Sequence, residues 1–227
     1  MEKLGTNYGG WYIPTDINLN KDSIIYSGGV GEDISFDILL QSKYDCNILL
    51  IDPTVKSVKH YEEVIQFYNN KKQFSGNIQP DYYSIISNYK PNLNKFTYLN
   101  EGLWNKKGTL KFYKQENDDY VSQSLINGMF GYKYDIINVN SIKNIMNNYN
   151  HSKIDMLKLD IEGSEITVLN QMLDDDIFPN YLCIEFDLAL KGIDKNNDTH
   201  LLLKRLLTGN YKLLKNDNLN MTLKYNV

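Results

Sequence analysis

The length, composition and charge of the chain exclude several classes of protein. Its 227 residues fit one large domain or two small ones and can bury a full hydrophobic core, and we expect one domain. The formal net charge of -4 and the pI near 5.4 give no basic surplus for binding nucleic acid or an anionic membrane. No apolar run approaches the roughly 18 residues that span a bilayer, and the first residues lack the apolar core of a signal peptide, so we expect a cytoplasmic protein.

Five apolar runs bounded by turn residues predict buried strands. Because these runs are nearly continuous, both faces of each strand should be covered by other parts of the chain. The strands are expected at residues 23–27, 47–52, 96–100, 154–160 and 181–187.

Amphipathic stretches alternate with these strands and predict helices. The clearest case is a stripe formed by Ile166, Leu169 and Met172. An alternation of strands and helices indicates a parallel sheet with helices on both faces. The helices are expected at residues 32–41, 55–68, 164–173 and 199–207.

The end of the chain departs from this alternation. Two strand-like runs, residues 211–214 and 220–225, are joined by Asn216-Asp217-Asn218, which leaves no room for a crossover helix. They should therefore pair as an antiparallel hairpin. A mostly parallel, seven-stranded sheet that ends in such a hairpin is the outline of the class I, or Rossmann-like, methyltransferase fold. We predict an α/β fold of this class.

The domain organisation follows from the lengths of the intervals between these elements. We predict one domain over residues 23–227 and, before it, an N-terminal extension of residues 1–22 that packs on the domain. The interval of residues 102–152 is too long for a simple crossover and contains a further strand-like run at residues 108–113. We interpret this interval as an inserted cap over the active face.

Three glycines follow the first predicted strand, at Gly28, Gly29 and Gly31. Ligands of an open parallel sheet lie beyond the carboxyl ends of the strands, where bare backbone lets them approach the next helix. An ordinary tight turn would also explain the glycines. Asp52 ends the second strand, 21 residues past Gly31, where a carboxylate can accept hydrogen bonds from ribose hydroxyls. Together these residues predict a cofactor that contains adenosine.

The residues after the glycines favour S-adenosylmethionine over a dinucleotide. A dinucleotide site has a third spaced glycine, and this chain has Ile34 at that place. Glu32 and Asp33 put negative charge where a diphosphate would lie, whereas S-adenosylmethionine has no phosphate and carries a positive sulfonium. A dinucleotide-dependent oxidoreductase or epimerase stays open as an alternative, and so does a cofactor-binding module without turnover.

Acidic residues at two later strand ends are candidates for catalysis. Asp160 ends the fourth strand beside the cofactor crevice, where burial can raise the pKa of a carboxyl toward that of a useful base. Glu185 and Asp187 finish the neighbouring strand, and with Asp160 they are candidates for binding Mg²⁺. Glu165 is interpreted as a helix cap. We predict Asp160 as the base and His200, which follows a loop on the crevice side, as the second candidate.

Several segments, taken in order, resemble the FkbM-type methyltransferase family. The resemblance runs from about Tyr8 to Asp187, through YGGWYIP, IIYSGGVGED, LLIDP, FTYLNEGLWNKKGTLKF, VSQSL, MLKLDIEGSE and LCIEFD. Its most specific part is KLDIEGSE at residues 158–165, because the family has a lysine, an aspartate, a glutamate and a glycine in this order on this strand.

The resemblance implies methylation by S-adenosylmethionine, usually of a hydroxyl on a sugar or a polyketide-type metabolite. It places the cofactor against the glycine turn, Asp52, the strand end Asn100-Glu101, and Asp160. The family often has an acidic residue just before the glycines, where this chain has Tyr26-Ser27. We expect Ser27 or a main-chain carbonyl to contact the methionine amino group instead. The resemblance thus predicts an O-methyltransferase for a sugar or glycan precursor, with or without a divalent metal.

Overall fold

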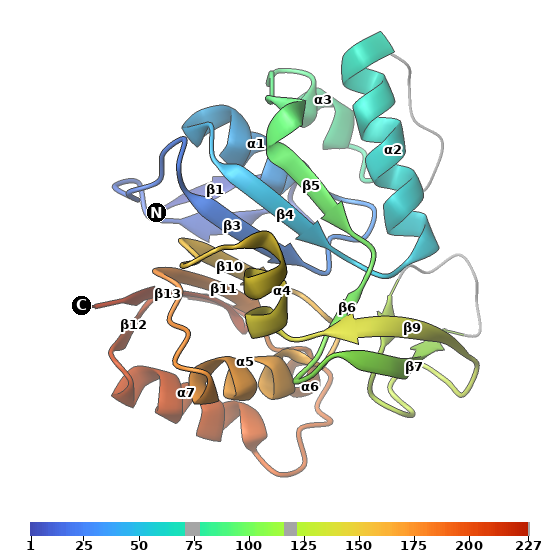
Figure 1. Cartoon of the computed structure of the whole chain (residues 1–227), viewed down its shortest axis with the longest axis vertical. Helices are drawn as coiled ribbons and strands as arrows, with labels where there is room; N and C mark the ends of the chain where they lie inside the picture. Colours follow the sequence, from blue (N-terminus) through green and yellow to red (C-terminus); the bar gives the residue numbers. More distant parts are fainter. Residues whose placement is uncertain (71–77, 116–121, 227) are drawn as a thin grey trace.

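A seven-stranded sheet forms the centre of the computed structural model, which describes residues 1–70, 78–115 and 122–226. The strand order is β12-β13-β11-β10-β3-β4-β5 (Figure 1). Six strands run parallel, and β13 lies antiparallel to both of its neighbours. This order with one reversed strand is the class I, Rossmann-like methyltransferase fold, as the sequence predicts.

The strands of this sheet lie close to the predicted positions. Both faces are buried, with Ile48 and Leu50 in one apolar cluster and Leu49 and Ile51 in the other. This explains the nearly continuous apolar runs, because successive side chains of a strand point to opposite faces. The strands are β3 (Ile24–Gly28), β4 (Asn47–Ile51), β5 (Phe96–Leu99), β10 (Met156–Leu159), β11 (Tyr181–Glu185), β12 (Tyr211–Asp217) and β13 (Asn220–Tyr225).

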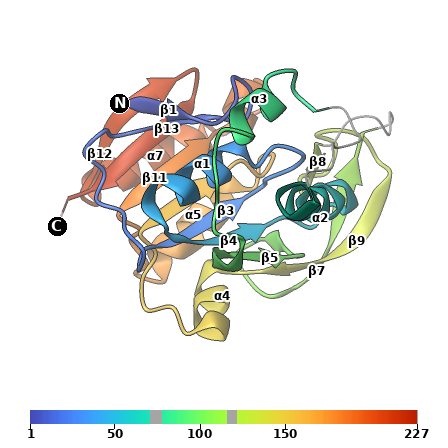
Figure 2. The ribbon, with the colours of Figure 1, turned by 90° about the horizontal axis from the view of Figure 1, so that it is seen from above.

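Helices cover both faces of the sheet (Figures 1 and 2). One face carries α1 (Ser35–Tyr44), α2 (Val55–Asn70) and α3 (Tyr82–Ile86), and the other carries α4 (Ile142–Tyr149), α5 (Glu165–Asp174) and α7 (Asp198–Thr208). The short helices η1 (Leu93–Lys95) and α6 (Asp187–Leu190) lie in connections. Among the described residues, no helix is long and apolar enough to span a membrane.

Helix α1 begins three residues later than predicted. The carboxylate of Asp33 accepts a hydrogen bond of 2.9 Å from the amide of Ser35 and a second of 2.5 Å from the hydroxyl of Thr6. Asp33 therefore holds the chain in a turn before the helix starts, as short polar side chains often do at helix starts.

The N-terminal extension packs on the domain as a hairpin of β1 (Glu2–Leu4) and β2 (Trp11–Ile13). The hydroxyl of Thr222, in β13, donates a hydrogen bond of 2.6 Å to the carbonyl of Tyr12. The loop between β1 and β2 is fastened to the turn before α1 through Thr6 and Asp33. The extension thus reaches β13 of the main sheet and the start of α1.

A second, four-stranded sheet forms the cap, in the order β6-β9-β7-β8. Its strands are β6 (Gly102–Leu103), β7 (Gly108–Lys114), β8 (Gln123–Ser124) and β9 (Tyr134–Asn140). The cap is shorter than the predicted residues 102–152, because α4 follows it and packs on the main sheet. The hydroxyl of Ser124 fastens the cap to the end of β10 by donating to the carbonyl of Glu162 at 2.5 Å. Residues 116–121 of the predicted cap lie outside the described residues.

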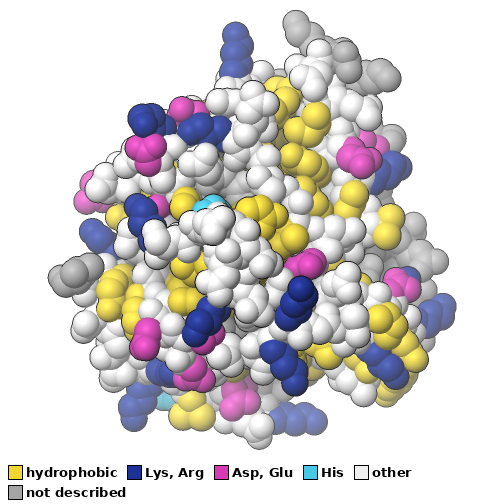
Figure 3. Space-filling model, viewed as in Figure 1, with side chains coloured by type: hydrophobic (Ala, Val, Ile, Leu, Met, Phe, Trp, Pro, Cys, Tyr) yellow, Lys and Arg dark blue, Asp and Glu magenta, His cyan; other side chains and the backbone are white. Residues whose placement is uncertain are grey.

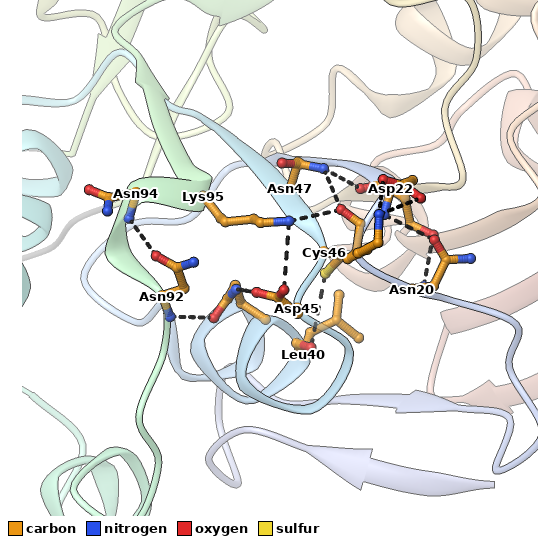
Figure 4. A network of polar contacts seen from close by, with 12 residues as sticks. Asn20, Asp22, Leu40, Asp45, Cys46, Asn47, Asn92, Asn94 and Lys95 are labelled. Atoms are coloured by element: carbon orange, nitrogen blue, oxygen red, sulfur yellow. Dashed lines mark hydrogen bonds and ion pairs between the residues drawn. The ribbon is translucent and has the colours of Figure 1, made fainter.

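Polar contacts fasten the amino ends of β4 and β5, opposite the ends that matter for ligand binding (Figure 4). Lys95 donates a hydrogen bond of 2.8 Å to the carbonyl of Lys21, and its ammonium lies 3.8 Å from the carboxylate of Asp45. The side-chain amide of Asn47 donates a hydrogen bond to the same carbonyl at 3.1 Å. Burial raises the pKa of the nearby Cys46 thiol to about 12, which makes it an unreactive core side chain.

Candidate functional site

A cavity of about 540 Å³ lies beyond the carboxyl ends of β3, β4, β10 and β11. This is where an open parallel sheet binds its ligands, and the volume is in the range of about 300–1,000 Å³ that ligand pockets occupy. The N-terminal loop closes one side with Tyr8, and the cap closes another with Phe112. At the strand ends the cavity is lined by Gly29, Asp52, Asp160 and Glu185.

The glycines after β3 are required mainly by contacts within the protein. A Cβ atom at Gly29 would lie 1.6 Å from the carbonyl oxygen of Asp160, and its backbone has a φ of +69°. A Cβ at Gly28 would lie 2.7 Å from the side chain of Leu103. At Gly28 and Gly29, the atoms that leave no room for a side chain therefore belong to the protein and not to a ligand. Gly29 and Gly31 also line the cavity.

Asp52 lies at the cavity wall and is only 5% exposed. One carboxylate oxygen accepts a hydrogen bond of 2.9 Å from the amide of Gly31, and the other accepts from the amide and hydroxyl of Thr54 at 2.8 and 2.7 Å. These contacts tie the glycine turn to the start of α2. A carboxylate can accept about four hydrogen bonds, so Asp52 keeps acceptor capacity for a ligand hydroxyl.

The buried side chain of Lys158 holds the glycine turn through a hydrogen bond. It is 4% exposed, and its ammonium donates a hydrogen bond of 2.7 Å to the carbonyl of Gly29. The same ammonium lies 6.0 Å from the centre of the Trp11 ring. Its positive charge also lowers the pKa values of the carboxyls of Asp160 and Glu185. Lys158 therefore has two roles: it holds the glycine turn in place, and it favours the charged forms of Asp160 and Glu185.

A group of acidic side chains lines the part of the cavity next to β10 and β11. The pKa of Asp160 is raised to about 7, chiefly by burial and also by the charges of Glu185 and Glu162, against the lowering effect of Lys158. Burial likewise raises the pKa values of Glu185 and Asp187. The ammonium of Lys191 lies 2.7 Å from Glu162 and also pairs with Asp187. The carboxyls of Asp160, Glu185 and Asp187 therefore titrate together near neutral pH, where one of them can accept a proton from a ligand.

The cavity as a whole has a strongly negative lining. Seven acidic side chains and two lysines face it. Such a potential attracts cations and opposes a diphosphate. The acidic residues are Glu32, Asp33, Asp52, Asp160, Glu162, Glu185 and Asp187, and the lysines are Lys158 and Lys191.

Comparison with protein families identifies the class. Residues 20–210 match the family model described as the methyltransferase FkbM domain. The chain belongs to the FkbM methyltransferase family. Among solved structures it is similar to the crystal structure of a fibrillarin/Nop5p complex, with a TM-score of 0.42 and 9% identity over 92% of this chain and 75% of that chain. No curated protein matches it.

Membership makes this FkbM protein a methyltransferase that uses S-adenosylmethionine. The cavity fits that cofactor in three respects. Its volume suits a nucleoside-sized ligand, Asp52 has acceptor capacity for a ribose hydroxyl, and the acidic lining complements the positive sulfonium and ammonium groups. The dinucleotide alternative has no comparable support, because the lining opposes a diphosphate.

The structure brings six of the predicted site residues of this methyltransferase to one cavity. These are Gly29, Gly31, Asp52, Asp160, Glu185 and Asp187. The others do not line it. Ser27 and Gly28 are buried beneath the turn, so the contact expected of the Ser27 side chain is not formed at the cavity wall. Asn100 is exposed beyond β5, and the carboxylate of Glu101 accepts a hydrogen bond of 3.0 Å from Asn140 of the cap.

The prediction of a catalytic His200 is not supported by the structure. Its side chain is exposed on α7 and does not line the cavity. The other two histidines are engaged elsewhere, His60 with the hydroxyl of Tyr82 at 2.8 Å and His151 with the hydroxyl of Tyr26 at 2.9 Å. Asp160 is therefore the candidate base that the geometry retains.

The metal candidates of the sequence do not form a suitable donor set. Over the described residues, no group of three or more histidine, cysteine, aspartate or glutamate side chains is placed to hold a metal ion. Asp160, Glu185 and Asp187 line the same cavity without forming such a group. We therefore assign no step to a metal.

Two lysines have roles in the site that the sequence does not show. The ammonium of Lys158 hydrogen-bonds a backbone carbonyl of the glycine turn. Lys191 was not anticipated, because nothing in its local sequence marks it. Glu165 is the first residue of α5, and its carboxylate accepts hydrogen bonds from the amides of Ile161 and Gly163 at 2.9 and 3.2 Å, so it holds the turn that precedes the helix and does not cap helix amides.

Proposed function

We propose that the protein transfers a methyl group from S-adenosylmethionine to a hydroxyl group of a sugar or glycan precursor. The observation that supports a hydroxyl acceptor is the carboxyl of Asp160, which lines the cavity and whose pKa burial raises to about 7. An alcohol has to lose its proton during or before attack on the methyl carbon. A carboxylate with such a pKa can take that proton at neutral pH.

The cofactor supplies an electrophilic methyl group that an acceptor oxygen can attack in line with the departing sulfur. The residues of the chain orient the partners for this reaction. The carboxylate of Asp52 accepts a hydrogen bond from a ribose hydroxyl, and the turn of Gly29 and Gly31 supports the nucleoside. Asp160 accepts the acceptor's proton as the new carbon–oxygen bond forms. Phe112 of the cap shields the site from water, which favours the aligned geometry that such a displacement needs.

The first experiment is a search for the acceptor. The purified protein would be incubated with S-adenosylmethionine and a panel of nucleotide sugars, free glycans and glycosides, and products carrying one added CH₂ unit would be sought by mass spectrometry. Methylation of a sugar hydroxyl is the expected result. Methyl transfer to an amine, or cofactor binding without methylation of any carbohydrate, would contradict the proposal.

The second experiment tests the base. Asp160→Asn should lower the rate of methyl transfer by about 10²- to 10⁴-fold, because general base catalysis typically contributes that much. Binding of S-adenosylhomocysteine, measured by calorimetry, should persist because Asp52 and the glycine turn are intact. Asp16→Asn, at an exposed position outside the cavity, is the matched control. Full activity of Asp160→Asn would remove this residue from the mechanism.

A further inference from the structure

A second, smaller cavity lies beside the first one. It has a volume of about 140 Å³ and is bounded by the loop between β1 and β2 and by the turn of the β12–β13 hairpin. Asn7, Tyr8 and Asn220 line both cavities. A ligand that extends out of the main cavity past these three residues therefore enters the second one.

The lining of the second cavity combines aromatic rings with side-chain amides. Amides donate and accept hydrogen bonds and so match the hydroxyls of a sugar, while an aromatic ring can cover its apolar face. Tyr8 is 73% exposed and offers such a ring, whereas the ring of Tyr12 is covered by the ammonium of Lys215 at 4.8 Å from its centre. The amides come from Asn7, Asn218 and Asn220.

Asn220 points most directly to a missing ligand. Its side-chain oxygen is buried and accepts no hydrogen bond from any part of the chain that the structure describes. A buried acceptor without a partner is unfavourable, and a ligand hydroxyl would satisfy it. Asn220 pairs with Glu185 across β13 and β11, so this oxygen lies next to the acidic wall of the main cavity.

The walls of the second cavity are held in place without a ligand. In the N-terminal loop, the amide of Thr6 donates to the hydroxyl of Ser35 at 2.9 Å, and the amide of Asn7 donates to the carboxylate of Asp81 at 3.1 Å. At the hairpin, the amide of Leu219 donates to the side chain of Asn216 at 3.0 Å. A site formed in advance loses little conformational freedom when it binds a ligand.

We propose that the second cavity binds a neutral sugar ring adjacent to the one that is methylated. The acceptor is then a glycan or glycoside of at least two units, and not a free monosaccharide. This inference rests on the proposed function, since it places the reacting ring in the main cavity and its neighbour between Tyr8 and Asn220.

Binding measurements with defined sugars test this proposal. Saturation-transfer NMR and calorimetry, with S-adenosylhomocysteine present, would compare methyl hexosides with the disaccharides that contain the same hexoses. The wild type should bind at least one disaccharide roughly tenfold more tightly than its methyl hexoside, a gain of about 1.4 kcal/mol. Asn220→Ala and Tyr8→Ala should abolish most of this preference. Tyr132→Ala, on the exposed surface of the cap, should keep it.

A stability measurement separates a binding role of Asn220 from a structural one. Because its oxygen has no partner among the described residues, Asn220→Ala should not lower the melting temperature. Equal affinity for methyl hexosides and disaccharides, or an unchanged preference in both variants, would overturn the second sugar site. Disaccharides that bind with this preference but are never methylated at a hydroxyl would instead overturn the proposed function alone.

Discussion

At the scale of single residues, Asp37 shows how burial couples charge to stability. This carboxyl of α1 is 1% exposed, and burial raises its pKa to about 6 although Lys158 and the Ser27 hydroxyl lower it. An unfolded aspartate has a pKa of about 3.9, so the folded protein holds this proton to higher pH. The tighter binding of this proton by the folded protein adds to the free energy of unfolding. This contribution is complete below a pH of about 4 and is lost as the pH rises through about 6.

Asp37→Asn should remove this part of the pH dependence. Between pH 4 and 7 the free energy of unfolding of the wild type should fall relative to that of the variant by about 3 kcal/mol, the equivalent of the shift in pKa. Urea denaturation at a series of pH values measures the difference. Asp16→Asn, at an exposed position, should follow the wild type. Parallel profiles for Asp37→Asn and the wild type would show that the carboxyl titrates normally.

At the scale of elements, the turn after β3 depends on the absence of a side chain at Gly29. Gly29→Ala should destabilise the fold by more than about 3 kcal/mol, because the new Cβ would overlap the end of β10. Gly192→Ala is a matched control, because Gly192 has a φ of +67°, close to the +69° of Gly29, but a Cβ added at Gly192 would have no atom within 4 Å. It should cost only about 1–2 kcal/mol for the left-handed backbone. Equal losses in urea denaturation would mean that backbone conformation alone requires glycine at position 29.

The elements of the main sheet could be predicted because their signals are local. Apolar runs give the strands, and a link too short for a helix forces the hairpin, although β12 continues to Asp217 and the turn is Asn218-Leu219. The delayed start of α1 was missed because Asp33, whose carboxylate accepts from the nearby amide of Ser35, is also held by the hydroxyl of Thr6, which is far away in the sequence. The extent of the cap was also missed, because α4 has the same pattern whether it packs on the cap or on the main sheet.

At the scale of the whole molecule, the cavity is assembled from segments that are far apart in sequence. Asp52 and Asp160 could be predicted because each follows a strand, and all parallel strands end at the same edge of the sheet. Tyr8 and Asn220 could not, because their meeting depends on how the N-terminal hairpin packs on β13. The lining of the cavity is mostly acidic, with only Lys158 and Lys191 as basic residues. On the face shown in Figure 3, by contrast, basic and acidic side chains are interspersed.

The negative cavity predicts a pH-dependent preference for cationic ligands. Sinefungin has an ammonium group in place of the sulfonium, whereas S-adenosylhomocysteine has a neutral sulfur. The pKa values of Asp160, Glu185 and Asp187 are raised to about 7, chiefly by burial. These carboxyls therefore lose their protons as the pH rises from about 5.5 to about 8.5. The cavity becomes more negative over this range, and sinefungin should gain about tenfold in affinity relative to S-adenosylhomocysteine.

Calorimetric titration of both ligands at each pH gives this ratio directly. Changes that affect the shared nucleoside cancel in the ratio, so S-adenosylhomocysteine is an internal control. Asp160→Asn should flatten the dependence, because the variant lacks one of the carboxyls that become charged. A ratio that stays constant with pH in the wild type would show that the acidic wall does not face the sulfonium position, and Asp160 could then not be the base that takes the proton of the acceptor.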